Sequence, residues 1–205
     1  MSEEPDTMEP DTIAASAPEA ADRIAEILVG GGVVVLPTDT VYGLAAMPDD
    51  SAALARVFEL KGRAADVPIA VLCASPTQAL ASAGAVRASA AMLASAHWPG
   101  PLTLVLPRHP DLEWDLGEPR TTIGVRCPDH DLIRRVTERV GPIAATSANR
   151  HGEPTPTTAA AAAASLTGAV DLVVDGGEIA GSASTVVDAT GEQPVVLRQG
   201  PIRID

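Results

Sequence analysis

The stretch Val33-Val34-Val35-Leu36-Pro37-Thr38-Asp39-Thr40 joins a continuous apolar run to a short polar loop. Such an apolar run is typical of a strand that is buried on both faces of a sheet. Residues 19–29 precede it, with apolar side chains at helical spacing, and the glycines at residues 30–32 separate the two segments. The order predicts a helix that leads into a buried strand, whose carboxyl end carries polar side chains.

The alternation of helix and strand continues along the chain. Further helices are predicted over residues 51–60, 87–97, 129–140 and 159–166, and further strands over residues 68–73, 102–106, 121–127, 143–146, 172–174, 185–188 and 194–198. Glycine-rich turns between the last three strands allow antiparallel pairing at one edge. The sequence therefore predicts an α/β protein with an open, twisted sheet of mixed parallel and antiparallel strands flanked by helices.

The length and the first segment indicate the domain organisation. A chain of 205 residues is long enough for one sizeable core, and nothing requires a second. Residues 1–18 are acidic and rich in Pro, Ser and Thr, so we expect a disordered segment there and one domain over residues 19–205. The start is not basic like that of a signal peptide, and no apolar run approaches the length of a membrane span. We expect a cytoplasmic protein.

The charge excludes some classes of partner. Acidic residues outnumber basic ones by 27 to 14, for a net charge of −13. This balance argues against a broad basic surface for nucleic acid or anionic lipid, so we expect direct nucleic-acid binding to be weak or absent and any anion site to be a local pocket. The four histidines lack metal-ligand spacing, and no metal site is predicted. Cys73 and Cys127 each lie in an apolar run and are expected to be buried free thiols.

Polar side chains follow two of the predicted strands. Thr38-Asp39-Thr40 comes after the first, and the apolar residues 143–145 run into Thr146-Ser147-Ala148-Asn149. Open α/β sheets bind ligands outside the carboxyl ends of their strands, so these segments are expected to line one crevice. Alternate residues of an extended segment share a face, which groups Thr38 with Thr40 and Tyr42, Thr122 with Gly124 and Arg126, and Ser147 with Asn149. Each group could face a ligand, although the same residue types also serve as turn and capping residues.

Four cations are candidates for binding anions. Lys61 is the only lysine, beside Gly62 and Arg63, and Arg126 and Arg198 lie inside apolar runs. A buried guanidinium needs an anion, so the four could together hold a polyphosphate and a carboxylate. Two alternatives stay open. Lys61 suits the last turn of a helix that ends at a glycine cap, and the arginines could form internal salt bridges to Asp39 or Asp188.

A set of motifs extends this interpretation. They are Pro37-Thr38-Asp39-Thr40-Val41-Tyr42-Gly43-Leu44, Lys61-Gly62-Arg63, Trp98-Pro99-Gly100-Pro101-Leu102-Thr103, Gly124-Val125-Arg126-Cys127-Pro128-Asp129-His130, Thr146-Ser147-Ala148-Asn149 and Ser184-Thr185-Val186-Val187-Asp188. In their residues and in their order along the chain, these motifs resemble those of the YrdC family of L-threonylcarbamoyladenylate synthases. The resemblance implies a fold with a concave, positively charged cavity. It also implies a nucleotidyltransferase that converts L-threonine, bicarbonate and ATP with Mg²⁺ into threonylcarbamoyl-AMP and pyrophosphate. A threonylcarbamoyl transferase complex would use this product to form threonylcarbamoyladenosine (t6A) in tRNA.

The resemblance also implies roles for single residues. Thr40, Arg126, Ser147 and Ser184 would contact threonine, and Lys61, Arg63, Thr122, Asn149, Thr157 and Arg198 would contact ATP. Lys61, Arg63, Ser147 and Asn149 would be the catalytic set. No general acid or base is needed, because positioning and charge neutralisation can drive the reaction.

Two departures from the family pattern leave alternatives open. Val67 and Leu72 stand where the family often has a polar residue and a histidine. Loss of these polar contacts could weaken binding or change the substrate. A paralogue with an altered substrate, including one that makes a carbamoyl adenylate, is therefore one alternative, and a non-catalytic RNA-binding or ribosome-associated protein is another.

Overall fold

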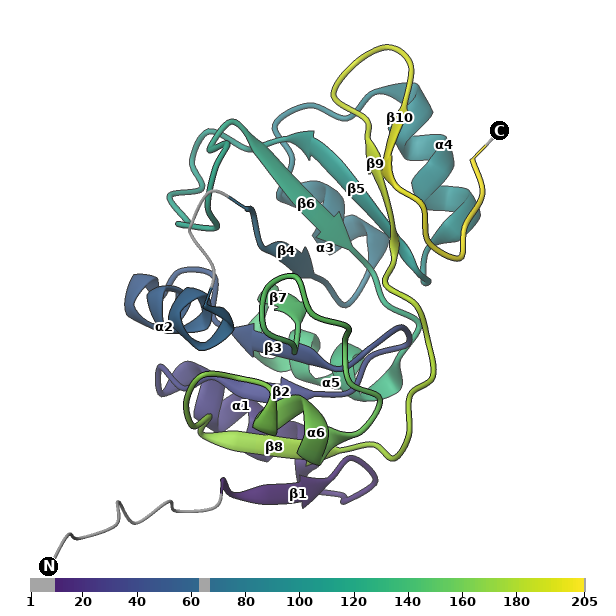
Figure 1. Ribbon diagram of the computed structural model, residues 1–205. Helices are drawn as coiled ribbons and strands as arrows, with labels where there is room; N and C mark the ends of the chain where they lie inside the picture. Colours follow the sequence, from purple (N-terminus) through teal and green to yellow (C-terminus); the bar gives the residue numbers. More distant parts are fainter. Residues whose placement is uncertain (1–9, 63–66, 205) are drawn as a thin grey trace, which may run out of the picture.

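The computed structural model describes residues 10–62 and 67–204 as one mixed sheet with helices on both faces (Figure 1). The helices are α1 (Ala20–Val29), α2 (Ser51–Lys61), α3 (Pro76–Ala81), α4 (Ala88–His97), α5 (Asp131–Val140) and α6 (Ala159–Ala164). The strands are β1 (Thr12–Ala14), β2 (Val34–Leu36), β3 (Gly43–Ala46), β4 (Ala70–Leu72), β5 (Leu102–Pro107), β6 (Thr122–Arg126), β7 (Ile143–Ser147), β8 (Leu172–Asp175), β9 (Thr185–Asp188) and β10 (Val195–Arg198).

The sheet is open and mixed, as the sequence predicts. Its strand order is β1-β8-β2-β3-β7-β4-β6-β5-β9-β10. Parallel pairs join β1 to β8, β8 to β2, β4 to β6 and β5 to β9, and the remaining neighbours are antiparallel. The predicted antiparallel edge is confirmed for β9 and β10, whereas β8 pairs with β1 and β2 in the other half of the sheet. The first and the last strand of the chain therefore form the two opposite edges of the sheet.

Side-chain alternation along β2 explains its continuous apolar run. Val33 and Val35 join a core cluster that includes residues of α2, α3, α4 and α6, while Val34 and Leu36 join a second cluster with α1 and α5. All four side chains are fully buried. Helices thus cover both faces of this part of the sheet, and a polar residue on either face would be left without water.

The structure also contains elements that the sequence analysis does not predict. Thr12–Ala14 forms β1 and pairs with β8, so the ordered domain begins before residue 19 and the prediction of disorder is wrong for this part of the first segment. Residues 1–9 lie outside the described residues. The strand β3 and the short helix α3 are likewise additional. Each of β1, β3 and α3 is too short to show a clear period in the sequence.

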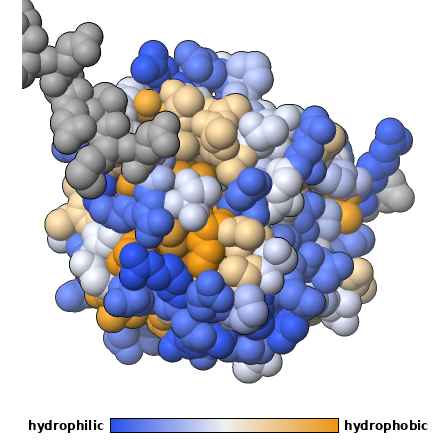
Figure 2. Space-filling view, turned by 90° about the horizontal axis from the view of Figure 1, so that it is seen from below, coloured by the Kyte–Doolittle hydropathy of each residue, from blue (hydrophilic) through white to orange (hydrophobic). Residues whose placement is uncertain are grey.

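Polar residues cover most of the face seen in Figure 2, with a small apolar area near its centre. Within residues 10–62 and 67–204, no helix is both long and apolar enough to cross a lipid bilayer.

Candidate functional site

A pocket of about 260 Å³ opens over one face of strands β4, β5, β6 and β7. On this half of the sheet the opposite face packs against the cluster that contains α3 and α4, and among the described residues no helix contributes to the pocket lining. The polar residues that line it are Thr38, Thr40, Thr103, Thr122, Arg126, Thr146, Ser147, Ser184 and Arg198. The predicted crevice therefore exists, although strand faces as well as strand ends form its walls.

The alternation rule places β6 correctly in this wall. Thr122, Gly124 and Arg126 all line the pocket, while Val125 lies in the core cluster behind the strand and Ile123 belongs to that cluster and also reaches the lining. Thr38 and Thr40 also line it. Tyr42 does not, because its ring is fully buried and its hydroxyl donates a 2.7 Å hydrogen bond to the carbonyl oxygen of Gly177.

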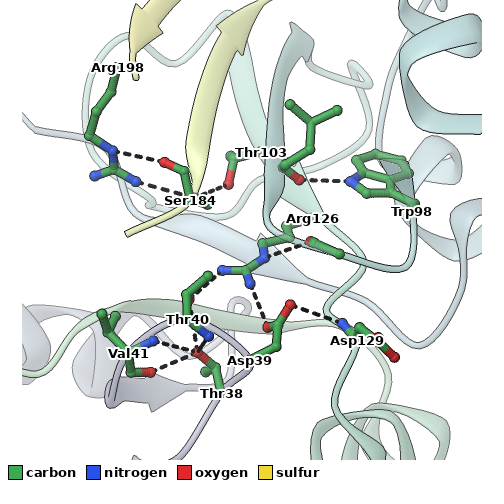
Figure 3. A network of polar contacts seen from close by, with 12 residues as sticks. Thr38, Asp39, Thr40, Val41, Trp98, Thr103, Arg126, Asp129, Ser184 and Arg198 are labelled. Carbon is green, nitrogen blue, oxygen red and sulfur yellow. Dashed lines mark hydrogen bonds and ion pairs between the residues drawn. The ribbon is translucent and has the colours of Figure 1, made fainter. Parts of the chain in front are cut away.

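Arg126 lies at the centre of a buried polar network (Figure 3). Its Nε donates to the carbonyl oxygen of Gly100 at 3.1 Å, its Nη1 to Thr40 Oγ1 at 2.9 Å and its Nη2 to Asp39 Oδ1 at 2.5 Å. Burial lowers the pKa of Arg126, and the carboxylate of Asp39 opposes this effect. The internal salt bridge to Asp39 is thus confirmed, and Arg126 is charged with its counterion beside it.

Arg198 and Ser184 form a second polar wall. Arg198 Nε donates to the Ser184 carbonyl oxygen at 3.1 Å and Nη2 to Ser184 Oγ at 3.2 Å, while Thr103 Oγ1 lies 2.8 Å from the same hydroxyl. Desolvation of its guanidinium lowers the pKa of Arg198, and the positive charge of Arg126 lowers it further. Two cations that repel each other across a pocket favour an anion between them. Among the described residues, Asp188 forms no salt bridge with an arginine, so the alternative pairing is not present.

Lys61 lies behind this pocket and supports its wall. It is the last residue of α2 and only 2% exposed, and Gly62 caps the helix with φ 58°. The Lys61 ammonium donates to the carbonyl oxygen of Ser147, to that of Asn149 at 2.8 Å and to Asn149 Oδ1 at 3.3 Å. The predicted role of Lys61 at the end of a helix is confirmed, and the lysine also fixes the loop after β7. Arg63 lies outside the described residues.

The other predicted site residues divide into two groups. Ser147 and Thr122 line the pocket, and Ser147 Oγ donates to Asn149 Oδ1 at 2.6 Å. The amide nitrogen of Asn149 donates to the carbonyl oxygens of Arg150 and Glu153, so the side chain joins Lys61 in holding the loop. Thr157 is exposed before α6, and the structure does not bring it into the pocket lining.

Asp39 and Thr103 are not among the residues predicted to bind a ligand, and Asp39 is predicted only as a possible salt-bridge partner of an arginine. Asp39 orients Arg126, and Thr103 contacts Ser184. The alternation of Leu102, Leu104 and Leu106 into the core could have placed Thr103 on the opposite, pocket-facing side of β5. Asp39 is one of two acidic residues predicted to pair with the arginines, but spacing does not identify which arginine it binds, because that partner lies 87 residues away in the chain.

A glycine allows the loop before β9 to close over this site. A Cβ atom built on Gly181 would overlap the carbonyl oxygen of Thr40. The loop can pass so close to Thr40 only because residue 181 has no side chain. Val67 and Leu72, the two departures from the family pattern, both line the same pocket and give it an apolar wall.

Comparisons with known proteins place this chain in one family. Residues 26–200 match the Sua5/YciO/YrdC family, which is described as telomere recombination. The threonylcarbamoyl-AMP synthase of Pyrococcus abyssi is 42% identical over 177 residues, which cover 85% of this chain and 52% of the relative. The Bacillus subtilis threonylcarbamoyl-AMP synthase is 39% identical over 199 residues, which cover 94% of this chain and 56% of the relative. The chain thus spans about half the length of these two relatives. A relative from Mycobacterium tuberculosis is 41% identical over 173 residues, and there the match covers 80% of the relative.

Solved structures show the same similarity. The crystal structure of P. abyssi Sua5 complexed with L-threonine has a TM-score of 0.86 and 39% identity, and the match covers 94% of this chain and 58% of that one. The crystal structure of Escherichia coli YciO has a TM-score of 0.83 and 28% identity, and the match covers 94% of this chain and 96% of that one.

Proposed function

Because this chain belongs to the Sua5/YciO/YrdC family, we propose that it is an enzyme that makes threonylcarbamoyl-AMP from L-threonine, bicarbonate and ATP. One observation carries the proposal. The pocket combines the hydroxyls of Thr40, Ser147 and Ser184 with the guanidiniums of Arg126 and Arg198. The fold around it is that of a relative whose structure contains L-threonine. Hydroxyls and guanidiniums are the groups that an amino acid and a phosphate chain require.

The proposed chemistry needs positioning more than proton transfer. The threonine amine would add to CO₂ derived from bicarbonate, and an oxygen of the resulting carbamate would attack the α-phosphorus of ATP with release of pyrophosphate. Guanidiniums next to the phosphates would neutralise the developing charge, and a pocket that excludes water strengthens this effect. Nucleotide contacts by Arg198, Thr122, Lys61 and Arg63 belong to this proposal. The support by Lys61 of the Ser147–Asn149 loop would also keep the pocket wall in place.

Mg²⁺ would enter this reaction with ATP. Among the described residues, no group of three His, Cys, Asp or Glu side chains is arranged to hold a metal ion. The triphosphate and water would therefore supply most of its oxygen ligands, as is common for Mg²⁺ at nucleotide sites. The product would pass in the cytoplasm to a transferase that modifies tRNA, with direct tRNA contact weak or absent.

The direct test is mass spectrometry of the purified protein incubated with ATP, Mg²⁺, bicarbonate and L-threonine, with pyrophosphate release measured in parallel. We expect a threonine-dependent adenylate. Serine is the control amino acid, because it lacks only the methyl group. Pyrophosphate release that depends on another amine, or no adenylate although ATP binds, would contradict the proposal and favour an altered substrate.

An arginine variant tests whether the pocket is the site of this reaction. Arg198→Gln removes the cation beside Ser184 and is expected to reduce kcat/KM at least tenfold, since charge-assisted contacts contribute about 1.5 to 3 kcal/mol each. Arg203→Gln removes an exposed arginine outside the pocket lining and serves as the matched control. Equal activity of the two variants would place the reaction elsewhere.

A further inference from the structure

Asp39 contacts the site without lining it. Its carboxylate is 11% exposed and absent from the pocket lining, which includes the neighbouring Thr38 and Thr40. Oδ1 accepts from Arg126 at 2.5 Å and Oδ2 accepts from the backbone N–H of Asp129 at 3.1 Å. Both oxygens of the carboxylate thus bind groups at the end of β6 and in the turn that leads to α5 (Figure 3).

Arg126 connects Asp39 to Thr40 through hydrogen bonds. With Nη2 on Asp39 and Nε on the Gly100 carbonyl, the plane of the guanidinium is fixed at two points. Its Nη1 then donates to Thr40 Oγ1 at 2.9 Å. A guanidinium is planar and can only donate, so the direction of this hydrogen bond is certain: Thr40 Oγ1 accepts.

Thr38 fixes the proton of the same hydroxyl. Thr38 Oγ1 lies 2.6 Å from the carbonyl oxygen of Val41, which can only accept, so the Thr38 proton is used there. In its 3.0 Å contact with Thr40 Oγ1, Thr38 Oγ1 can then act only as an acceptor, so the Thr40 proton points towards it. Thr38 Oγ1 shares its lone pairs between this hydroxyl and the backbone N–H groups of Thr40, at 3.1 Å, and Val41, at 3.2 Å. Thr40 Oγ1 therefore has its proton and one lone pair committed, and one lone pair remains for a ligand.

We propose that Asp39 is a positioning residue, which acts through Arg126 to keep Thr40 Oγ1 as a hydrogen-bond acceptor for a donor group of the amino-acid substrate. The inference rests on the proposed function for the identity of the substrate. An acceptor at Thr40 suits the amine or hydroxyl of threonine and not its carboxylate. The carboxylate then belongs at the opposite wall, where Arg198 and the Thr103–Ser184 hydroxyl pair can donate.

The test measures binding in place of turnover, with thermal-shift and calorimetric titrations of L-threonine and of ATP separately. Asp39→Asn keeps the shape and removes the charge. We expect it to weaken threonine binding about tenfold, the effect of roughly one charge-assisted hydrogen bond, with ATP binding changed less than about twofold. Threonine is titrated into the high millimolar range so that weak binding stays measurable.

A double-mutant cycle separates positioning from a general loss of stability. If Asp39 acts through Thr40, Asp39→Asn should add less than about twofold to the loss caused by Thr40→Val. Asp171→Asn is the matched control, since Asp171 also binds one arginine, Arg56 at 2.6 Å, and one backbone N–H, that of Val33 at 2.7 Å, outside the pocket. It should lower the melting temperature without weakening threonine binding.

The outcomes are distinct. A wild-type protein that binds ATP but no threonine would contradict the proposed substrate. A wild-type protein that binds threonine, with unchanged binding in Asp39→Asn or with fully additive losses in the double variant, would overturn the positioning role of Asp39 alone. Equal losses of threonine binding in Asp39→Asn and Asp171→Asn would also overturn it, because stability would then explain both.

Discussion

The ammonium of Lys61 lies 2.8 Å from the carbonyl oxygen and 3.3 Å from the side-chain oxygen of Asn149, 88 residues further along the chain. One cation at the end of α2 thereby holds the loop after β7 and the last residue of that strand, Ser147, which faces the pocket. The lysine is 2% exposed, so these carbonyl groups have little access to water. Stability and activity are therefore linked at this residue.

Replacement of Lys61 should cost stability as well as turnover. Lys61→Met keeps most of the side-chain volume and removes the donor, which leaves buried carbonyl oxygens without their partner. We expect the free energy of unfolding to fall by about 2 to 3 kcal/mol, measured by urea denaturation. Arg56→Met is the control, because its ion pair is more than a third exposed and should contribute less than about 1 kcal/mol. Unchanged stability of Lys61→Met would show that the ammonium does not hold the loop.

A methyl group at residue 181 should disturb Thr40. Gly181→Ala places a Cβ atom against the Thr40 carbonyl oxygen, so the loop or Thr40 must move. We expect at least tenfold weaker binding of L-threonine with smaller changes in ATP binding, measured by calorimetry. Gly191→Ala is the matched substitution, since its nearest non-neighbouring atom would lie 3.7 Å away, an ordinary contact. If both variants bind threonine like the wild type, the loop does not constrain the site.

The two cysteines should be inert in the folded protein. Cys73 and Cys127 are each 1% exposed, and burial raises the pKa of the Cys73 thiol from 9.0 to about 12. Burial also raises the pKa of Cys127. The thiolate is the reactive form, so iodoacetamide at about pH 8 should modify neither cysteine of the native protein and both after unfolding in urea. Intact-mass measurement checks this result, and rapid modification of the native protein would contradict it.

The same shift of Cys73 predicts a loss of stability in alkali. The unfolded chain loses the thiol proton above about pH 9, whereas the folded chain keeps it until about pH 12. The contribution of Cys73 to the free energy of unfolding is therefore fully present below the pKa of the unfolded thiol, and it declines as the pH rises from about 9 to about 12. Urea unfolding of Cys73→Ala at pH 8 and pH 10 should show a smaller decline than that of the wild type.

His130 should make the protein less stable in mild acid. Burial lowers its pKa below the ordinary value of 6.5 and Arg126 lowers it further, while Asp39, Asp131 and Asp129 oppose the shift. His130 of the unfolded chain then binds a proton at a higher pH than His130 of the folded chain. The contribution of His130 to the free energy of unfolding is therefore fully present above about pH 6.5 and falls as the pH drops below this value. Denaturation at pH 7.5 and pH 5 should show a smaller loss for His130→Gln than for the wild type. An equal loss would assign the acid sensitivity to other groups.

The sequence predicts much of the fold because its long elements have clear periods. The run before Pro37 gives β2, and strict alternation places Thr122, Gly124 and Arg126 on one face of β6. The strand Gly43–Ala46 escapes prediction because glycine and alanine have low strand propensity. Its pairing with β2 is local, whereas its other neighbour, β7, is distant in sequence.

The site is predicted less completely than the fold, for a related reason. Spacing identifies which residues share a face, but it does not give the partner of a charge. Asp39 pairs with Arg126 while Asp188 makes its side-chain contacts within its own turn, with Thr190. Tyr42 has the right spacing to join Thr38 and Thr40, yet its large ring gains more from the core. These choices depend on packing that only the folded chain defines.

The position of β9 and β10 in the chain sets the order in which the pocket can be assembled during synthesis. Thr40 is made early and Arg126 past the middle, but Ser184 and Arg198 come with the last two strands of the sheet. A nascent chain released up to α6 would therefore hold one polar wall without the other. Ligand binding would then report that translation has reached the end of the domain, and a cut between β9 and β10 would separate Arg198 from Ser184.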